Sequence, residues 1–341
     1  MNPAVINLLV FAGIILLIWL VVKLVTSRNL LQSKSNKQKT LTEDILKQLY
    51  HVEESKRTAT LSDLSGALKM RRRIILPIIE ASIASGLLQY ANEALQLTPA
   101  GREYALKIVR VHRLWEKYLA ERTGYKPSDW HHLAEKMEHK LNEIDTSELS
   151  SGLGNPMFDP HGDPIPTEKG VIMPVKWIPL PSYPENLPGK IAHIEDEPGV
   201  IYNQILARRI FVGSHIMVKK SSNNKVIFHC EGHGHLLSPI VAANINVIPL
   251  NPEEAYEKNA LRLSTLKIGE LAGIIGISQE CRGANRRRLL DFGMLPGTRI
   301  TVDLESPMRD PIAYRVRNTS IALRNSLADL ILINKTKTND N

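Results

Sequence analysis

Two short stretches of the sequence combine histidine and glutamate at helical spacing. In VHRLWEKYL, His112 and Glu116 are four positions apart, and HHLAEKMEH contains a second series, His131, Glu135, Glu138 and His139. Residues four apart lie on the same side of a helix, so each stretch would present imidazole and carboxylate groups together. Two helices that each present such groups inward form a usual site for a divalent metal.

The alternative for each stretch is a solvated helix face, on which histidine and glutamate serve no metal. One stretch alone leaves both interpretations open. Two stretches with the same ligand types favour the metal site. His132 falls off the shared face and is expected to be exposed.

A third group of potential ligands occupies residues 229–235, HCEGHGH, and includes His229, Cys230, His233 and His235. On a hairpin, alternate residues fall on one face or in the turn, so an additional metal site is one interpretation. An exposed hairpin that binds no metal is the simpler alternative.

The sequence contains none of the common catalytic patterns. It has no phosphate-binding loop, no GxSxG elbow and no pair of catalytic carboxylates, and Cys281 has no evident histidine or aspartate partner. Two cysteines in 341 residues are too few for a disulfide framework and fit a reducing compartment. We therefore predict that the protein is not an enzyme.

The first element that the sequence predicts is an apolar segment near the N-terminus. Residues 4–22 carry no charge, and a helix over residues 4–25 is long enough to cross a bilayer. A cleaved signal peptide would need a basic start, a shorter apolar core and a small-residue cleavage site, which are missing. The basic residues of a polar, flexible linker, 26–40, then predict a single-pass protein of the inner membrane with its C-terminal bulk in the cytoplasm.

Residues 41–110 are predicted to form a winged helix-turn-helix, because three helical segments precede an alternating hairpin, GLLQYANEALQL. Thr98 and the proline after it supply an N-cap and first turn for a long helix. A helical domain over residues 111–166 follows, with a break near residues 124–127. It ends in NPMFDPHGDPIP, which is expected to be a rigid extended connector.

The C-terminal half repeats itself. Residues 188–220 and 268–304 each contain a glycine-led strand, a short helix with a basic pair, a glycine turn and a second strand, and each is followed by a hairpin. A unit of this size fits a small β-barrel with one short helix. We predict two tandem SH3-like barrels, over residues 180–250 and 261–335, behind a mainly α-helical N-terminal half.

Several of these segments resemble a known protein family. VHRLWEKYL, WHHLAEKMEHKLN and NPMFDPHGDPIP, in this order, resemble the metal-binding and dimerisation domain of the DtxR/MntR metalloregulators. The last part, from LSTLKIGELAGI to DPIAYRVRNTSIALR, is similar to FeoA-type SH3-like domains. The resemblance covers about residues 40–335 and implies a homodimer that binds DNA when metal is present.

The resemblance also implies two neighbouring metal positions. One set of ligands is His112, Glu116 and His131; the other is Glu135, Glu138 and His139, with Asp44 from the first helix. Nitrogen and oxygen ligands suit Mn²⁺ or Fe²⁺. Lys47 stands where the manganese branch has a second acidic ligand, so a single metal is an alternative. The acidic segment 195–197 of the first barrel is a further contributor.

The expected recognition helix, residues 71–85, limits how DNA would be read. Arg71, Arg72 and Arg73 can contact phosphate, but Leu76 and Pro77 stand where the family usually has polar residues. A proline within a helix is expected to kink or break it. Two hypotheses follow: a membrane-anchored Mn²⁺- or Fe²⁺-dependent transcriptional regulator, or a metal-sensing adaptor that binds a membrane protein, such as a metal transporter, through its FeoA-like domains.

Overall fold

The computed structural model describes residues 19, 23, 35–92, 94–251 and 260–335. The chain divides into two compact units, Met1–Val109 and Arg110–Asn341. The predicted membrane helix over residues 4–25 lies outside the described residues, except for Trp19 and Lys23. Within the described ranges, no helix has both the length and the apolar character needed to cross a membrane.

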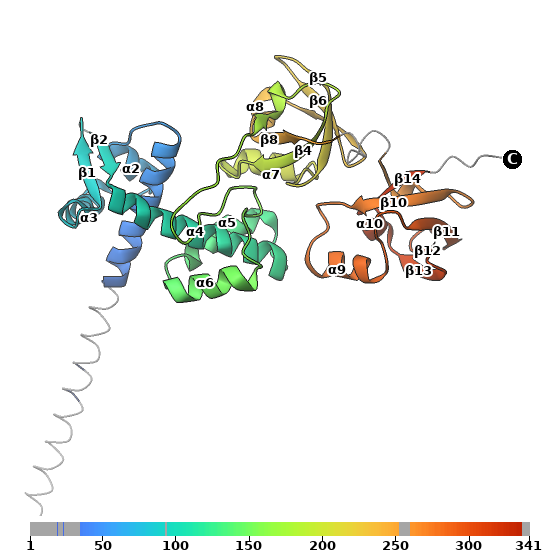
Figure 1. The fold of residues 1–341 in the computed structure, drawn as a ribbon, viewed down its shortest axis with the longest axis horizontal. Helices are drawn as coiled ribbons and strands as arrows, with labels where there is room; N and C mark the ends of the chain where they lie inside the picture. The colour runs from blue at the N-terminus through green and yellow to red at the C-terminus, as the bar shows by residue number, and fades with distance from the viewer. Residues whose placement is uncertain (1–18, 20–22, 24–34, 93, 252–259, 336–341) are drawn as a thin grey trace, which may run out of the picture. The chain divides into compact units, whose positions relative to one another are not determined.

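The N-terminal unit has the predicted order of helices and strands. A helix over residues 35–54 is followed by α2 (Leu61–Ala67), α3 (Arg72–Ala84), β1 (Leu88–Ala91), β2 (Ala94–Leu97) and the start of α4 (Pro99–Arg122) (Figure 1). Thr98 is the expected N-cap of α4, since its Oγ1 accepts a hydrogen bond from the amide of Gly101 at 3.1 Å. The first helix begins earlier than predicted. Residues 35–40 are helical rather than linker, because their lysines and glutamine are good helix formers.

Helix α3 runs through Pro77 without ending there. The prediction of a break at this position is therefore wrong. Pro77 is exposed, so its missing amide leaves no cavity or buried polar group behind. The opposite face of α3 buries Ile75, Ile78 and Ile79, and this apolar packing offsets the hydrogen bond lost at the proline.

In the C-terminal unit, α4 continues to Arg122 and is followed by α5 (Pro127–Met137) and α6 (Glu143–Gly152). The break before α5 is where the sequence predicts it, and Pro127 is the first residue of the new helix. A second break, before α6, was not predicted. Asn142 caps α6 there, because its side chain accepts from the amide of Asp145, whose carboxylate accepts from the Asn142 amide in return.

The connector at residues 155–166 is a closed loop, not the extended segment that its prolines predict. Phe158 and Pro164 form a β-bridge. Between them, Oδ1 of buried Asp159 accepts hydrogen bonds from the amides of His161, Gly162 and Asp163 at 2.8, 2.9 and 2.9 Å. An aspartate that accepts from the amides following it makes a tight turn, and this turn directs His161 inward.

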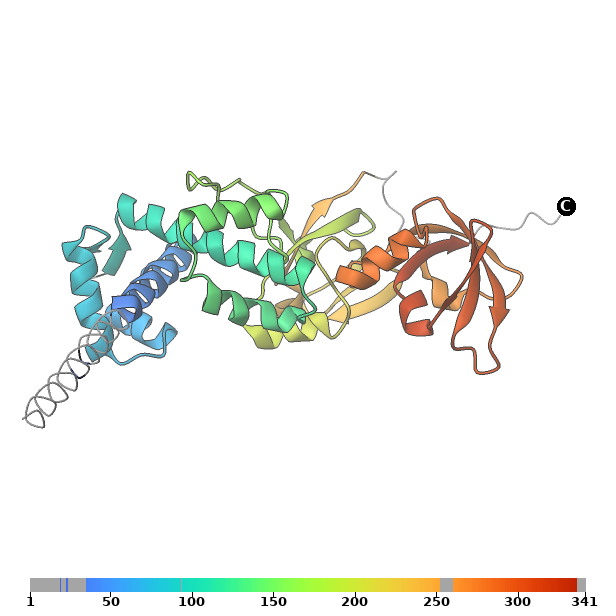
Figure 2. The same cartoon turned by 90° about the horizontal axis from the view of Figure 1, so that it is seen from below.

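Two antiparallel six-stranded sheets form the rest of the unit, and their strand orders match. The first has the order β3-β8-β4-β5-β6-β7 and the second β13-β12-β11-β10-β14-β9, so that β3 corresponds to β9, β4 to β10 and β8 to β14. The bulge positions match as well, between Ile191 and His193 in β4 and between Ile274 and Gly276 in β10. The predicted repeat is thus a repeat of topology. Figures 1 and 2 show the two sheets, coloured from yellow to light orange and from orange to red.

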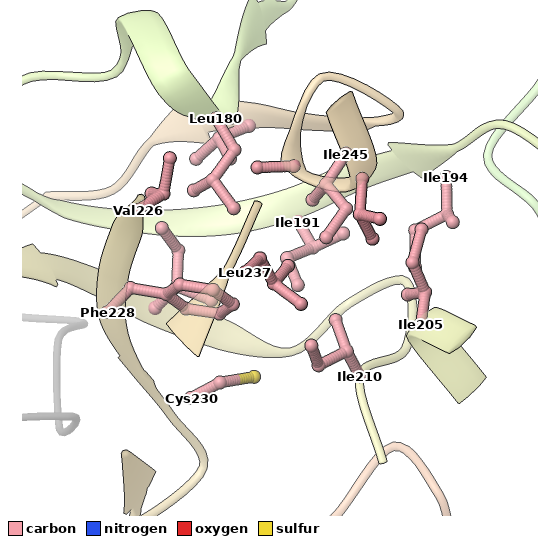
Figure 3. Close-up of a cluster of buried hydrophobic side chains, with 14 of the residues drawn as sticks. Leu180, Ile191, Ile194, Ile205, Ile210, Val226, Phe228, Cys230, Leu237 and Ile245 are labelled. Carbon is pink, nitrogen blue, oxygen red and sulfur yellow. The ribbon is translucent and has the colours of Figure 1, made fainter. Parts of the chain in front are cut away.

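The elements of the first sheet are β3 (Ile178–Pro179), η1 (Leu180–Ser182), β4 (Pro188–Ile194), α7 (Gly199–Leu206), β5 (His215–Ser221), β6 (Val226–Cys230), β7 (His233–Leu237), α8 (Pro239–Ala242) and β8 (Ile245–Pro249). Those of the second are β9 (Leu261–Arg262), η3 (Leu263–Thr265), β10 (Leu271–Ile277), α9 (Gly283–Asp291), β11 (Arg299–Glu305), β12 (Ile312–Val316), β13 (Thr319–Leu323), α10 (Asn325–Ala328) and β14 (Ile331–Lys335). Each sheet packs around its own apolar core. We keep the predicted names, first barrel and second barrel, for the segments 178–249 and 261–335 that contain these two sheets. Figure 3 shows the first core, in which Ile191, Phe228 and Ile245 point toward one another.

Candidate metal centre

Helices α4 and α5 bring the first predicted set of ligands together. His112 and Glu116 lie one turn apart on α4, and His131 lies on α5. The two helices are held by a small core in which Trp130 and Ala134 of α5 pack with Leu119 and Ala120. Trp130 faces this core, and the next residue of α5, His131, lies against Glu116 of α4.

One carboxylate oxygen of Glu116 lies close to both imidazoles. Its Oε1 lies 3.1 Å from Nε2 of His112 and 3.2 Å from Nδ1 of His131, and the two imidazole nitrogens are 3.3 Å apart. Ligands that share an ion at about 2.0–2.2 Å are separated by roughly these distances. His112 and Glu116 are both buried, at 7% and 2% exposure.

Two further side chains complete the cluster. Asp196 lies in the acidic segment 195–197 that was expected to contribute, whereas His161 was not among the predicted ligands. His161 comes from the connector, and its Nε2 is 3.7 Å from Oε1 of Glu116 and 3.8 Å from Oδ2 of Asp196. Asp196 comes from the loop after β4, and its Oδ2 is 3.1 Å from Nδ1 of His131. The sequence signals were the histidine of DPHGDPIP and the acidic segment 195–197, whose register the sequence left open.

The charges of the cluster stabilise one another. Burial opposes ionisation of Glu116, but the charges of His112 and His161 outweigh it and hold the pKa of this carboxyl well below its usual range. Burial also works against the charged form of His131, yet hydrogen bonds to Asp196, Glu116 and Glu135 raise its pKa to about 12. The pKa of Asp196 is lowered in turn, against burial, by its hydrogen bond to His131.

The residues fit a divalent cation. His161 is 2% exposed, and neither of its ring nitrogens makes a hydrogen bond to any residue that the structure describes. A buried imidazole without a hydrogen bond costs free energy unless a cation or a water molecule binds its nitrogens. Two overlapping sets have the spacing of metal ligands: His112, Glu116 and His131, and Glu116, His161 and Asp196. Three nitrogens and two carboxylates favour a first-row divalent metal over a soft ion.

The second predicted set is placed differently. Glu138, the residue after the last turn of α5, is 4% exposed and pairs with Nδ1 of His112, so within this unit it orients a ligand of the first set. Oε1 of Glu138 is 3.5 Å from Nε2 of His139. Oε1 of the more exposed Glu135 lies 3.6 Å from Nε2 of His131. Asp44 lies in the helix over residues 35–54 of the N-terminal unit, and its role as a ligand stays a prediction.

The cluster at residues 229–235 does not converge on one point. Cys230 is in the core of the first barrel, and Glu231 pairs with Arg262. His235 stacks on Phe228 with ring centroids 5.2 Å apart. Among the residues that the structure describes, neither His229 nor the other three predicted ligands of this cluster, Cys230, His233 and His235, joins a set close enough to share an ion.

Comparison with known proteins finds similarity to metal-dependent repressors. Residues 98–167 match the family described as "Iron dependent repressor, metal binding and dimerisation domain", and residues 261–335 match the FeoA domain. A solved manganese-dependent transcriptional repressor in complex with manganese is similar over 61% of this chain and 100% of its own, at 26% identity and a TM-score of 0.55.

Two curated relatives extend the comparison. The iron-dependent repressor IdeR of Mycobacterium leprae is 26% identical over 58% of this chain and 92% of its own length. A probable metal transport system membrane protein of Chlamydia trachomatis is 42% identical over 81 residues, which are 24% of this chain and only 18% of that protein. The fold and the cluster around Glu116 thus match those of metal-dependent repressors. Residues 98–167 thus belong to the metal-binding and dimerisation domains of iron-dependent, DtxR-type repressors, and residues 261–335 form a FeoA domain.

Proposed function

We propose that the protein is a membrane-anchored transcriptional regulator of metal homeostasis that binds DNA as a homodimer when Mn²⁺ or Fe²⁺ is bound. The observation that carries the proposal is the cluster in which three histidines approach Glu116 and Asp196 approaches two of those histidines, His131 and His161. The similar proteins include repressors named for manganese and for iron, and both ions accept nitrogen and carboxylate ligands.

The DNA-binding surface in this proposal is the start of α3. Arg71, Arg72 and Arg73 are exposed there, as phosphate contacts require. The test is retention of the full chain on fragments of its own genome at moderate salt, with and without Mn²⁺. Changing all three arginines to glutamine should weaken binding to every fragment about equally. The same change at three exposed arginines of the second barrel, Arg287, Arg299 and Arg317, is the matched control. Equal retention with and without metal would refute the proposal.

A second candidate is the metal-sensing adaptor, with a metal-transport membrane protein as its partner. The exposed face of α3 favours it, because Ile74 and Leu76 are 41% and 37% exposed and Pro77 lies beside them. Such a face has few groups to hydrogen-bond to bases. The adaptor predicts metal-dependent co-purification with a membrane transporter from cross-linked cells, and no metal-dependent retention on DNA.

The anchor in the proposal is the apolar segment 4–25, with the C-terminal bulk in the cytoplasm. Its support is the length and charge pattern of the sequence. Deleting residues 1–25 should move the protein from the membrane fraction to the soluble fraction without changing its affinity for Mn²⁺. A protein that stays soluble with the segment intact would contradict this part of the proposal.

A further inference from the structure

The second barrel is fixed to the first through a fully buried carboxylate. Glu231, in the turn between β6 and β7, is 1% exposed. It accepts hydrogen bonds from Oγ of Ser278 at 2.5 Å and from the amide of Gln279 at 3.0 Å, and its Oε2 is 3.5 Å from the guanidinium of Arg262. All three donors belong to the second barrel, and Arg262 is itself 3% exposed.

A second ion pair and a close backbone approach support the same contact. The guanidinium of Arg209, from the first barrel, lies 2.5 Å from both Glu280 and Asp329 of the second. A Cβ added to Gly232 would come within 3.0 Å of the carbonyl oxygen of Ala260. Buried pairs that satisfy one another and leave no room between backbones define a specific orientation.

The same edge of the second barrel reaches the metal helices. Arg282 lies just before α9, and its guanidinium carbon is 5.0 Å from the ring centroid of Trp130 and 5.8 Å from that of Phe211. Trp130 is 1% exposed and precedes the ligand His131 in α5. Its ring also lies 5.9 Å from that of His161. The Trp130 indole is therefore close to both His161 of the metal centre and Arg282 of the second barrel, and it directly precedes His131 in the chain.

We infer that Arg282 is a positioning residue of the metal centre: its guanidinium holds the Trp130 indole, and the indole in turn fixes His131 and His161. The inference rests on the proposed metal binding. The second barrel is then part of the sensor itself, because it acts on the ligands through Trp130. A cation over an indole in a partly desolvated place is attracted strongly enough to hold a side chain in one orientation.

The test is calorimetric titration of the full chain with Mn²⁺, in detergent, for the parent and for three variants. Arg282→Gln removes the cation and should weaken Mn²⁺ binding about threefold to tenfold. Arg282→Lys keeps a cation above the ring and should recover most of the affinity. Arg287→Gln, at an exposed position of α9, is the matched control and should bind as the parent does.

An affinity of Arg282→Gln within twofold of the parent would overturn the inference, as would a loss in Arg282→Lys as large as that in Arg282→Gln. If circular dichroism shows that Arg282→Gln has lost its fold, Arg209→Asn takes its place. Asparagine tolerates the φ of +59° at this position, and the change weakens the contact between barrels without touching Trp130. Weaker Mn²⁺ binding supports the inference and parent-like binding overturns it. A parent chain that binds no Mn²⁺ refutes the proposed function, and the inference falls with it.

Discussion

Glu116 is the residue on which the metal centre depends most. His112, His131 and His161 approach the same carboxylate oxygen, within 3.1–3.7 Å. Without this carboxylate, His112 would keep Glu138, and His131 and His161 would keep Asp196, but no anion would be shared by all three imidazoles. The residue therefore supplies charge as well as geometry, and no other side chain of the cluster is shared by both sets of ligands.

Glu116→Gln should weaken Mn²⁺ binding by about a hundredfold or more, because it removes a ligand and the charge that balances the histidines. The measurement is calorimetric titration of the full chain. Glu103→Gln is the control, since Glu103 lies on the same helix and its exposed side chain pairs with Lys107 at 3.3 Å. Equal affinities of the two variants would remove Glu116 from the site.

His235 gives the first barrel a dependence on pH. Burial, together with the charge of His233, lowers the pKa of His235 to about 4, from an ordinary value of 6.5. The folded barrel thus binds fewer protons than the unfolded chain. The contribution of this residue to stability is complete above about pH 6.5 and is lost as the pH falls toward 4.

Between pH 7 and pH 4 the parent should therefore lose on the order of 2 kcal/mol more stability than His235→Phe does. Urea unfolding of both proteins at several pH values measures this difference. His229→Phe is the control, because His229 is exposed on β6 of the same hairpin and this variant should follow the parent. Parallel curves for the parent and His235→Phe would show that His235 is not the cause.

Part of the site could be predicted residue by residue. The four-residue spacing of His112 and Glu116, and of the series that begins at His131, depends only on helix geometry. His161 and Asp196 could not be assigned in this way. Their contributions depend on a turn made by the connector and on how a barrel loop is seated, and neither follows from a local spacing rule.

At the scale of elements, the connector decides whether the first barrel reaches the metal centre. The amide of Ile194 in β4 donates to the carbonyl of His161 at 2.9 Å. Nε2 of His193 lies 3.4 Å from Oδ2 of Asp163. These contacts place the end of β4 against the connector, and Asp196 follows two residues later. The connector and β4 therefore position His161 and Asp196 together.

Gly162→Ala should separate this pair. Gly162 has a φ of +96°, and an added Cβ would lie 2.0 Å from the carbonyl oxygen of Ala192, so the connector must move away from β4. We expect Mn²⁺ affinity to fall at least about tenfold and stability by roughly 2 kcal/mol or more. Gly199→Ala is the control, because a Cβ at Gly199 meets nothing within 4 Å. Normal titration and unfolding curves for Gly162→Ala would contradict the role of the connector.

The elements themselves were largely predictable where a capping or breaking residue marks them. Thr98 and Pro127 begin helices as their types suggest. The failures have a common cause. Pro77 stays inside α3, and the prolines of the connector form a closed loop, because burial of neighbouring residues outweighs local preference at both places.

At the scale of the whole molecule, the repeat was visible in the sequence but the joint between its copies was not. Glu231 belongs to a cluster whose histidines suggested a metal. Its carboxylate instead binds Arg262 and Ser278. Residues far apart in the sequence that pair once leave no periodic pattern, so only the folded chain reveals them.

Glu231→Ala should leave Arg262 buried without its carboxylate, at a cost of about 3–5 kcal/mol. We expect urea unfolding monitored by circular dichroism to begin at lower urea, with the second barrel unfolding in its own transition. Glu270→Ala removes a solvent-accessible pair with Lys335 and, as the control, should leave the unfolding curve close to that of the parent. Coincident curves for Glu231→Ala and the parent would mean that the buried pair does not hold the barrels together.

The matched topology of the two sheets has one more consequence. Aligning β4 with β10 places the loop of residues 195–197 over residues 278–280. In the first barrel this loop provides Asp196 to the metal centre; in the second, Ser278 and Glu280 hold Glu231 and Arg209 of the first barrel. Each barrel thus contacts the part of the chain before it through the same loop. Such a head-to-tail contact uses different surfaces on its two sides, so one more copy of the barrel could in principle be added in the same way.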